Sequence, residues 1–186
     1  MELEDNGLSQ RGYLYALGSP RVVDGATRWD LQLLDWTSSR QRHKVYSTWA
    51  AEIFNAVDTV DGALIMMSAL QELCRGVYQT PEKLIRLWQR GGFKTPMIVF
   101  TDCRSIFSAV SSEHIRTPTE KSTLFHAQWI RQLIDCHVLI LVWLDTRDMI
   151  CDGLTKGSVD REALQKAMQG HWVIAQETAS FPPEKP

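Results

Sequence analysis

The longest uninterrupted apolar run in this chain is only as long as a β-strand, and it restricts the possible folds more than any other feature. It covers residues 138–144, with the sequence VLILVWL. A run in which every side chain is apolar is typical of a strand that is covered on both faces. The run is too short to cross a membrane. We therefore expect an α/β protein whose sheet is covered by helices.

Strand and helix patterns alternate along the rest of the chain. Strands are expected at residues 12–17 and 29–36, which should form a hairpin with a break at residues 18–20 (GSP), and at residues 97–102. Helices are expected at residues 47–76, 80–90, 105–110, 119–134 and 158–170. The order β-β-α-α-β-α-α-β-α describes a mixed sheet with helices on its faces.

The length of 186 residues suits one domain with a full hydrophobic core. The hydrophobic fraction of 44% and the charged fraction of 23% are ordinary for a soluble globular protein. We place the domain at residues 1–170. Residues 171–186 contain three prolines and are expected to form a disordered tail.

The formal net charge of −2 excludes a basic surface over the whole domain of the kind that binds nucleic acid tightly without sequence preference. It is compatible with an enzyme that meets nucleic acid through metal ions and one local basic patch. Such a patch is offered by the connector after the second strand, with Arg40, Arg42, His43 and Lys44. The ordinary alternative is a solvated loop.

The cysteines and the N-terminus bear on the compartment. Cys74, Cys103, Cys136 and Cys151 show no CxxC spacing, so we expect reduced thiols and no zinc site. The N-terminus, MELED, is acidic and resembles neither a secretory signal nor a transit peptide. We expect an intracellular protein of the cytoplasm or nucleus, not secreted and without a membrane partner.

Three acidic residues lie far apart in the sequence, at places from which a folded sheet could bring their carboxylates together. Glu52 is one turn into the first helix, Asp102 ends the strand at residues 97–102, and Asp152 follows the apolar run. Converging carboxylates hold the hard cations Mg²⁺ and Mn²⁺. Each residue also has an ordinary explanation: Glu52 as a solvated acid near a helix N-terminus, and the two aspartates as helix caps.

The segments around these acids resemble the ribonuclease H domain at the end of copia-type (LTR) retrotransposon Pol polyproteins. Similar elements occur in the same order at residues 35–41 (DWTSSRQ), 47–52 (STWAAE) and 101–105 (TDCRS), at Lys121 and Ile130-Arg131, and at residues 142–146 (VWLDT) with 151–156 (CDGLTK). The resemblance runs from about Ser9 to Lys156, which is most of the chain.

The resemblance implies a ribonuclease H-like mixed sheet flanked by helices, and a nuclease that hydrolyses the RNA strand of RNA–DNA hybrids. Glu52, Asp102 and Asp152 would be the catalytic and metal-binding residues, with Mg²⁺ or Mn²⁺ as the cofactor. The hybrid would be recognised by its shape and its 2′-hydroxyls, with the basic patch on backbone phosphates. A reverse transcriptase domain would lie upstream in a full-length element.

The chain also departs from the family pattern. Ser122 and Leu124 stand where the family has a histidine and an acidic residue, and Cys103 stands where asparagine is common. The family's first metal-binding aspartate lies on a central strand that would precede Ser9, so we expect most or all of that strand to be missing. Only Glu2, Glu4 and Asp5 are acidic there.

Two other functions stay open. The chain could be a non-catalytic relic or a domesticated fragment that only binds nucleic acid or protein, and the missing strand favours that interpretation. It could also be a metal-free α/β scaffold with an unrelated ligand.

Overall fold

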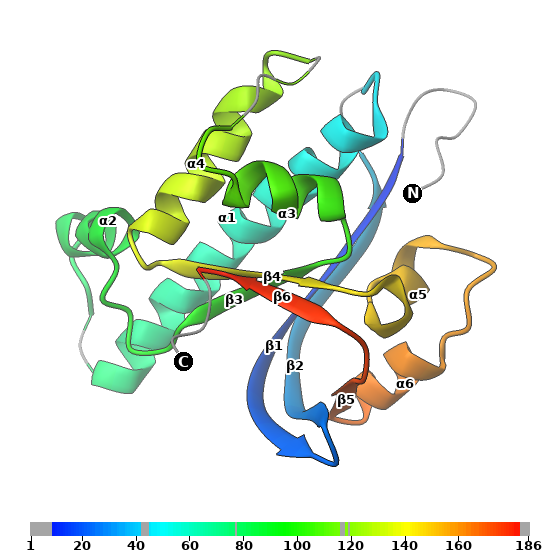
Figure 1. Ribbon diagram of the computed structural model, residues 1–186. Coiled ribbons are helices and arrows are strands. Elements are labelled where there is room, and N and C mark those ends of the chain that lie inside the picture. The colour runs from blue at the N-terminus through cyan, green and yellow to red at the C-terminus, as the bar shows by residue number, and fades with distance from the viewer. Residues whose placement is uncertain (1–8, 42–44, 77, 116–117, 119, 183–186) are drawn as a thin grey trace. The chain divides into compact units, whose positions relative to one another are not determined.

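The protein is a mixed α/β chain with two small sheets and helices (Figure 1). The structure, a computed structural model, describes residues 9–41, 45–76, 78–115, 118 and 120–182. These residues form two compact units. The first unit comprises the chain up to Ala51 together with Leu144–Thr178, and the second comprises Glu52–Trp143 together with the chain from Ala179.

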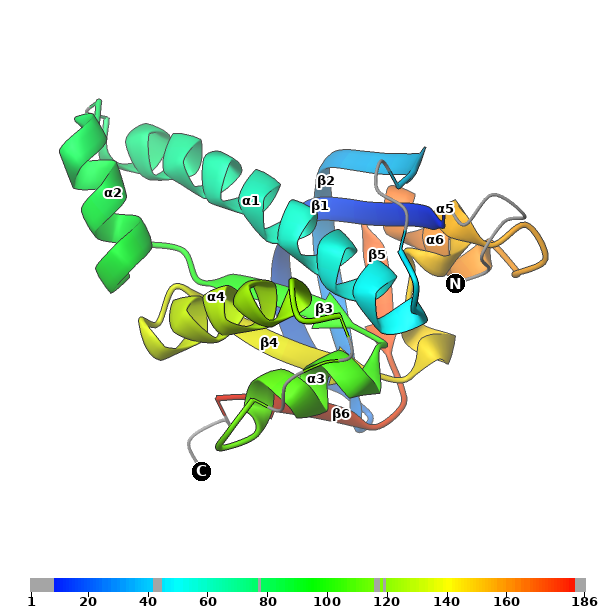
Figure 2. The ribbon, with the colours of Figure 1, turned by 90° about the horizontal axis from the view of Figure 1, so that it is seen from above.

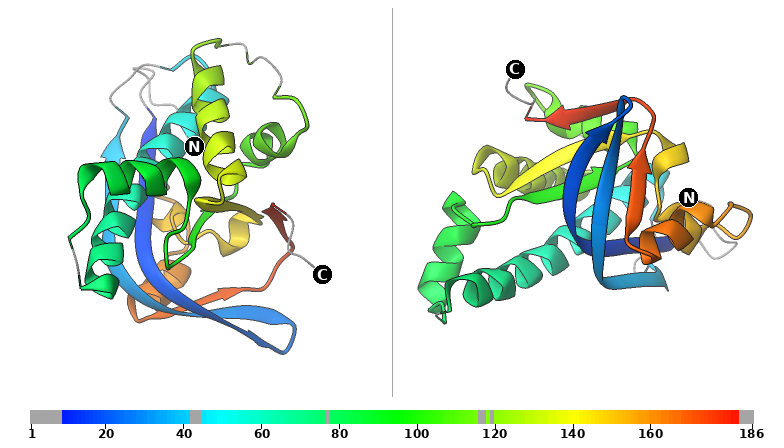
Figure 3. Two further views of the ribbon diagram at one scale, coloured as in Figure 1. Left: turned by 90° about the vertical axis from the view of Figure 1, so that its left-hand side faces the viewer. Right: turned by 90° about the horizontal axis from the view of Figure 1, so that it is seen from below.

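An antiparallel sheet in the order β1-β2-β5 organises the first unit (Figure 3). Its strands are β1 (Gln10–Val23), β2 (Ala26–Arg40) and β5 (His171–Ile174). Asp24 and Gly25 join β1 to β2 with φ angles of 51° and 78°. Two successive residues in the left-handed region are typical of the hairpin turn that the dipeptide Asp-Gly favours. The hairpin prediction is therefore confirmed, with longer strands than expected.

The predicted strand break at residues 18–20 is wrong, because β1 continues through all three residues. Pro20 lies opposite Trp29 on the neighbouring strand. Proline cannot donate a backbone hydrogen bond, so strands tolerate it at the edge of a sheet. In the order β1-β2-β5, β1 is an edge strand, which explains why proline did not end it.

Short helices and turns complete the first unit. They are the 3₁₀ turn η1 (Thr146–Asp148), α5 (Asp152–Thr155) and α6 (Glu162–Met168). An added Cβ on Gly12 of β1 would lie 2.6 Å from Cγ2 of Thr155, so glycine permits α5 to lie this close to the strand. Of these elements, only α6 lies within a predicted helix.

Residues 171–186, predicted as a disordered tail, instead contain β5 and a further strand, β6 (Thr178–Phe181). Trp172 and Ile174 of β5 are buried, whereas His171 and Val173, which alternate with them, are exposed. This alternation gives β5 an apolar face to pack. The buried Asp148 carboxylate accepts hydrogen bonds from the backbone N–H groups of Ala175 and Gln176, at 3.0 and 2.7 Å, and so orders the turn after β5.

The second unit contains a sheet in the order β3-β4-β6 and most of the helices. Its strands β3 (Met97–Thr101) and β4 (Leu139–Leu144) are parallel. Its helices are α1 (Thr48–Arg75), α2 (Pro81–Arg90), α3 (Arg104–Ser111) and α4 (Thr123–Asp135). Figure 2 shows α2 beside the C-terminal end of α1, and Figure 1 shows α3 and α4 on one face of the sheet.

The helix starts follow from the sequence. The hydroxyl of Ser47 accepts a hydrogen bond from the backbone N–H of Ala50 at 3.1 Å, as expected for a residue that caps α1. Thr80 caps α2 in the same way through Lys83, and Pro81 occupies the first turn. Of the apolar residues expected to form the inner face of α1, Ile53, Val60, Leu64 and Met67 are buried, and Val57 is half-buried.

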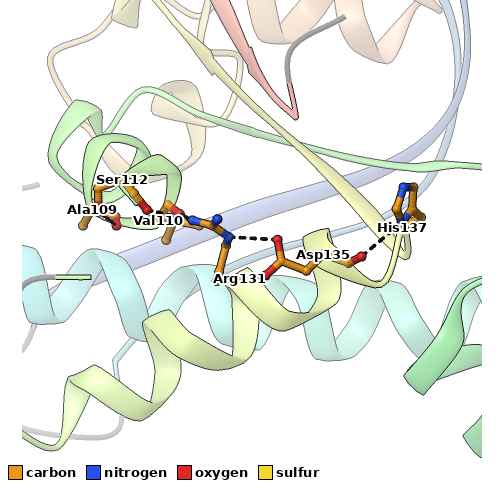
Figure 4. A network of polar contacts seen from close by, with 6 residues as sticks. All are labelled: Ala109, Val110, Ser112, Arg131, Asp135 and His137. Carbon is orange, nitrogen blue, oxygen red and sulfur yellow. Dashed lines mark hydrogen bonds and ion pairs between the residues drawn. The ribbon is translucent and has the colours of Figure 1, made fainter. Parts of the chain in front are cut away.

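Arg131 of α4 joins the last turn of α3 to its own helix (Figure 4). Its guanidinium donates hydrogen bonds to the carbonyl oxygens of Val110 and Ser112, both at 2.8 Å, and pairs with Asp135 at 2.9 Å. The guanidinium carbon also lies 4.8 Å from the ring centre of Phe181 on β6. One side chain thus satisfies carbonyl groups that the end of α3 leaves without helical partners.

Helix α1 alone among the described helices is long and apolar enough to cross a membrane, judged by length and composition. Only 28% of its apolar window is buried. One such helix is weak evidence, because the core helix of a soluble protein passes the same test. The expectation that the chain has no membrane partner stays a prediction.

The predicted element order holds from β1 to β4, but the predicted single mixed sheet does not. The described strands form two three-stranded sheets, one antiparallel and one that contains the parallel β3–β4 pair. The combination of helices with these sheets still confirms the broader prediction of an α/β protein.

Candidate functional site

Asp102 lies in the turn between β3 and α3, and neighbouring groups fix its backbone. The indole N–H of Trp143, on β4, donates a hydrogen bond to the carbonyl oxygen of Asp102 at 3.0 Å. The hydroxyl of Thr101 accepts a hydrogen bond at 3.1 Å from the backbone N–H of Cys103, the residue that follows Asp102. The Arg104 guanidinium stacks over the Trp143 ring at 4.4 Å. Two adjacent parallel strands therefore position Asp102.

The carboxylate of Asp102 does not cap the following helix. The residue at the N-cap of α3 is Cys103, and no side chain makes a cap hydrogen bond there. Within the described residues, no donor bonds the Asp102 carboxylate, although the residue is only partly exposed. The capping explanation for this aspartate is wrong, and its oxygens remain available for another ligand.

Glu52 lies one turn after the start of α1 and is the first residue of the second unit. The backbone before Glu52 belongs to the first unit and is held there by Gln41. The Gln41 side chain accepts a hydrogen bond from the Ser9 hydroxyl at 2.6 Å and donates one to the carbonyl oxygen of Ala51 at 3.3 Å. Gln41 is buried, and it belongs to the segment that resembles the family. This contact fixes the backbone immediately before Glu52.

The Cys103 thiol experiences the negative charges of both Glu52 and Asp102. Burial is the main cause that raises the pKa of the Cys103 thiol, and the negative charges of Glu52 and Asp102 raise it further. The hydroxyl of Ser105, 3.3 Å from the sulfur, and the backbone N–H of Ile106 lower it in part. Both carboxylates thus act on one thiol. That thiol is protonated at neutral pH and is a poor metal ligand.

Asp152 belongs to the first unit and is the first residue of α5. Its side chain is 11% exposed, and Lys156, one turn later, places Nζ 2.7 Å from the carboxylate. The N-cap of α5 is Cys151, and no side chain makes a cap hydrogen bond there. Asp152 is therefore a buried acid neutralised by a lysine, not the helix cap that was the ordinary alternative.

The candidate site has suitable oxygen atoms for a divalent cation but lacks a complete set of ligands among the described residues. Glu52 and Asp102 supply hard carboxylate oxygens of the kind that Mg²⁺ and Mn²⁺ prefer. In the part of the chain that the structure describes, however, no group of three or more His, Cys, Asp or Glu is arranged to hold a metal ion. Glu52 and Asp102 of the second unit both raise the pKa of the Cys103 thiol, whereas Asp152 is paired with Lys156.

Only one residue of the predicted basic patch can be placed. Arg40 is exposed at the end of β2. Arg42, His43 and Lys44 lie outside the described residues.

Sequence reasoning overlooked Cys103 as part of the site and Lys156 as the partner of Asp152. The second could have been found, because residues four apart face each other on a helix.

The described residues define an α/β protein in which Asp102 follows the parallel strand β3 and the charge of Glu52, on α1, acts on the adjacent Cys103. No protein-family model matches this chain, and no curated protein or solved structure matches it.

Proposed function

We propose that this chain is a ribonuclease H-like domain of a copia-type retrotransposon Pol polyprotein, which hydrolyses the RNA strand of an RNA–DNA hybrid. The observation that carries the proposal is the Asp102 carboxylate at the end of β3, which does not cap α3, together with the negative charges of Glu52 and Asp102 that both raise the pKa of the Cys103 thiol. The resemblance assigns metal-binding roles to these two residues, and they come from different elements, a helix and a strand end.

The arrangement of strands also supports the proposal. In the fold that the resemblance implies, a central first strand pairs on both sides and makes the sheet continuous. None of the described strands has that central place, and the described strands form two separate sheets. Two sheets are expected when the central strand is not among the described strands. The hairpin, the long helix and the parallel pair follow each other in the order that the resemblance predicts.

In this proposal Glu52 and Asp102 would hold divalent cations with their carboxylate oxygens. Asp152 is assigned to the same ion set on the sequence resemblance alone. Bound Mg²⁺ would neutralise charge on the scissile phosphate and lower the pKa of the attacking water. Trp143 and Thr101 keep the Asp102 backbone in place, and Arg40 is a candidate contact for a backbone phosphate.

Lys156 has a defined part in this scheme. It neutralises Asp152 in the absence of a cation, at a distance of 2.7 Å. If Asp152 binds a cation, the ammonium group must move away, since two positive charges would otherwise compete for the same oxygens. The released lysine would then be available to contact a phosphate.

The second candidate function is a non-catalytic relic or domesticated fragment that binds nucleic acid or protein. The ion pair between Asp152 and Lys156 favours it, because this carboxylate is already neutralised by a protein group. The lack of a three-ligand cluster among the described residues agrees with it.

A cleavage assay separates the two functions. Purified chain is incubated with an end-labelled RNA–DNA hybrid and Mg²⁺ or Mn²⁺, beside the variants Glu52→Gln and Asp102→Asn. We expect metal-dependent cleavage of the RNA strand, and a loss of about a hundredfold or more in each variant. The control is Asp135→Asn, which removes an exposed carboxylate of the same unit. This variant should cleave the hybrid like the wild type.

Two results would contradict the nuclease. One is the absence of cleavage by wild-type chain whose fold is confirmed by circular dichroism. The other is undiminished cleavage by Asp102→Asn. Hybrid binding that is equal in the wild type and both site variants, without cleavage, would identify the non-catalytic alternative.

A further inference from the structure

The second unit contains a pocket of about 490 Å³ that no part of the proposed nuclease uses. It lies between α1, α2 and α4. Most of its lining residues are apolar, and two of them, Leu64 and Leu133, are buried. Two indole rings, those of Trp88 and Trp129, also line it. Pockets of this size and composition hold small organic molecules.

The packing of α2 explains why this space is open. Leu64 and Leu133 on α1 and α4 are buried, whereas none of the residues of α2 is buried. Ile85 of α2 lines the pocket and is 50% exposed. Helix α2 thus presents an apolar face that the other two helices cover only in part. A ligand in the pocket would complete that packing.

One of the tryptophans is fixed before any ligand arrives. The indole N–H of Trp88 donates a hydrogen bond to the hydroxyl of Ser68 at 3.0 Å. That hydroxyl in turn donates to the carbonyl oxygen of Leu64 at 2.8 Å. A ring held at its polar edge keeps its orientation, so a ligand that contacts it loses little free energy in ordering the site.

The pocket has one acidic side chain, Asp61, and neither lysine nor arginine among its lining residues. Partial burial raises the pKa of Asp61, and the charge of His126, which also lines the pocket, offsets this in part. In the described part of the chain, no donor bonds the Asp61 carboxylate. The His126 ring packs edge-on against Phe54 at 5.0 Å.

We propose that the pocket between α1, α2 and α4 binds a small organic cation with a quaternary ammonium head. Indole rings attract such cations through their faces, and the Asp61 carboxylate adds charge complementarity, which a positively charged His126 would oppose. A quaternary ammonium group carries methyl groups and donates no hydrogen bonds, so it suits apolar walls better than a primary amine does. This site is independent of the proposed nuclease and would exist with or without that activity.

The test compares two ligands of equal shape. Choline is titrated into the full chain beside 3,3-dimethylbutan-1-ol, in which an uncharged carbon replaces the nitrogen. Binding is followed by the NMR shifts of the indole N–H groups. We expect saturable shifts of the Trp88 and Trp129 signals with choline, and affinity at least about tenfold weaker for the neutral isostere.

Variants identify the groups responsible. Asp61→Asn should weaken choline binding about tenfold and leave the isostere unchanged. Trp129→Leu should weaken choline binding while keeping an apolar wall. Asp58→Asn, on the same helix but not in the pocket lining, is the control and should bind choline like the wild type. NMR signal dispersion reports whether each variant is folded.

Three results would overturn the proposal. They are the absence of saturable shifts with choline, equal affinity for choline and its neutral isostere, and unchanged choline binding in folded Asp61→Asn. A preference for the isostere would identify an apolar pocket without cation recognition and would also contradict it.

Discussion

At the scale of single residues, Cys103 is the most useful reporter of the candidate site. Its thiol pKa is raised by burial and then by the charges of Glu52 and Asp102. Only the thiolate reacts with alkylating reagents. Removing either negative charge therefore lowers the thiol pKa, increases the thiolate fraction at a given pH and speeds alkylation.

We predict this effect in a chain whose other cysteines, Cys74, Cys136 and Cys151, are replaced by serine. Iodoacetamide should modify Cys103 about two- to fivefold faster at pH 8 in Glu52→Gln and in Asp102→Asn than in the parent. Mass spectrometry gives the rates. Asp135→Asn is the control and should not change them. Equal rates in all variants would mean that the carboxylates do not act on this thiol.

Lys156 is the second residue whose role can be measured. It neutralises Asp152, which is almost completely buried. Replacing Lys156 with methionine keeps the apolar stem and leaves a buried carboxylate without its cation. We expect a loss of about 1 to 3 kcal/mol in the free energy of unfolding, measured with urea.

Lys166 supplies the matched control for Lys156. It pairs with Glu162 at the same spacing on α6, at 2.6 Å, but both side chains are at least 60% exposed. Lys166→Met should cost less than about 1 kcal/mol. Equal effects of the two substitutions would show that burial of Asp152 does not matter to stability.

At the scale of elements, Arg131 holds α3 to α4 through two carbonyl groups (Figure 4). Arg131→Met should leave both carbonyls without this donor and cost about 1 to 3 kcal/mol in unfolding free energy. Asp135→Asn removes only the ion pair, and the Asp135 side chain is 58% exposed, so its cost should stay below about 1 kcal/mol. The reverse order of the two effects would assign the stabilisation to the ion pair.

The elements also show what the sequence could and could not predict. Helix starts at Ser47 and Thr80 were predictable because capping depends on a few neighbouring residues. The course of β1 through Pro20 was not, because it depends on which strand lies at the sheet edge. Strand β5 was missed because four residues are too short a pattern to indicate a strand by themselves, and its pairing with the distant β2 is not a local signal.

The candidate site follows the same division. Asp102 was found because it ends a clear run of strand-forming residues, and Glu52 because it follows a capped helix start. The effect of the Glu52 charge on the Cys103 thiol could not be predicted, since the two residues are 51 positions apart and no local pattern connects them. The pocket between three helices was missed for the same reason: its lining comes from residues 57 to 133, which no local pattern connects.

At the scale of the whole molecule, the two units are built from interleaved segments. The chain passes from one unit to the other after Ala51, Trp143 and Thr178. The proposed ligands are divided accordingly, with Glu52 and Asp102 in the second unit and Asp152 in the first. The nuclease proposal therefore requires Mg²⁺ to stabilise backbone in both units.

Hydrogen exchange with mass spectrometry tests this requirement. At a Mg²⁺ concentration about 100 times the dissociation constant, bound ions stabilise the folded state by about 2.7 kcal/mol. Exchange through openings that release the ions should then slow by about a hundredfold, both at α5 and at the turn from β3 to α3. Asp102→Asn should remove the protection at both places if one ion set is shared. Protection limited to the β3–α3 turn would mean that Asp152 is not a ligand, and protection at neither place would contradict the metal site.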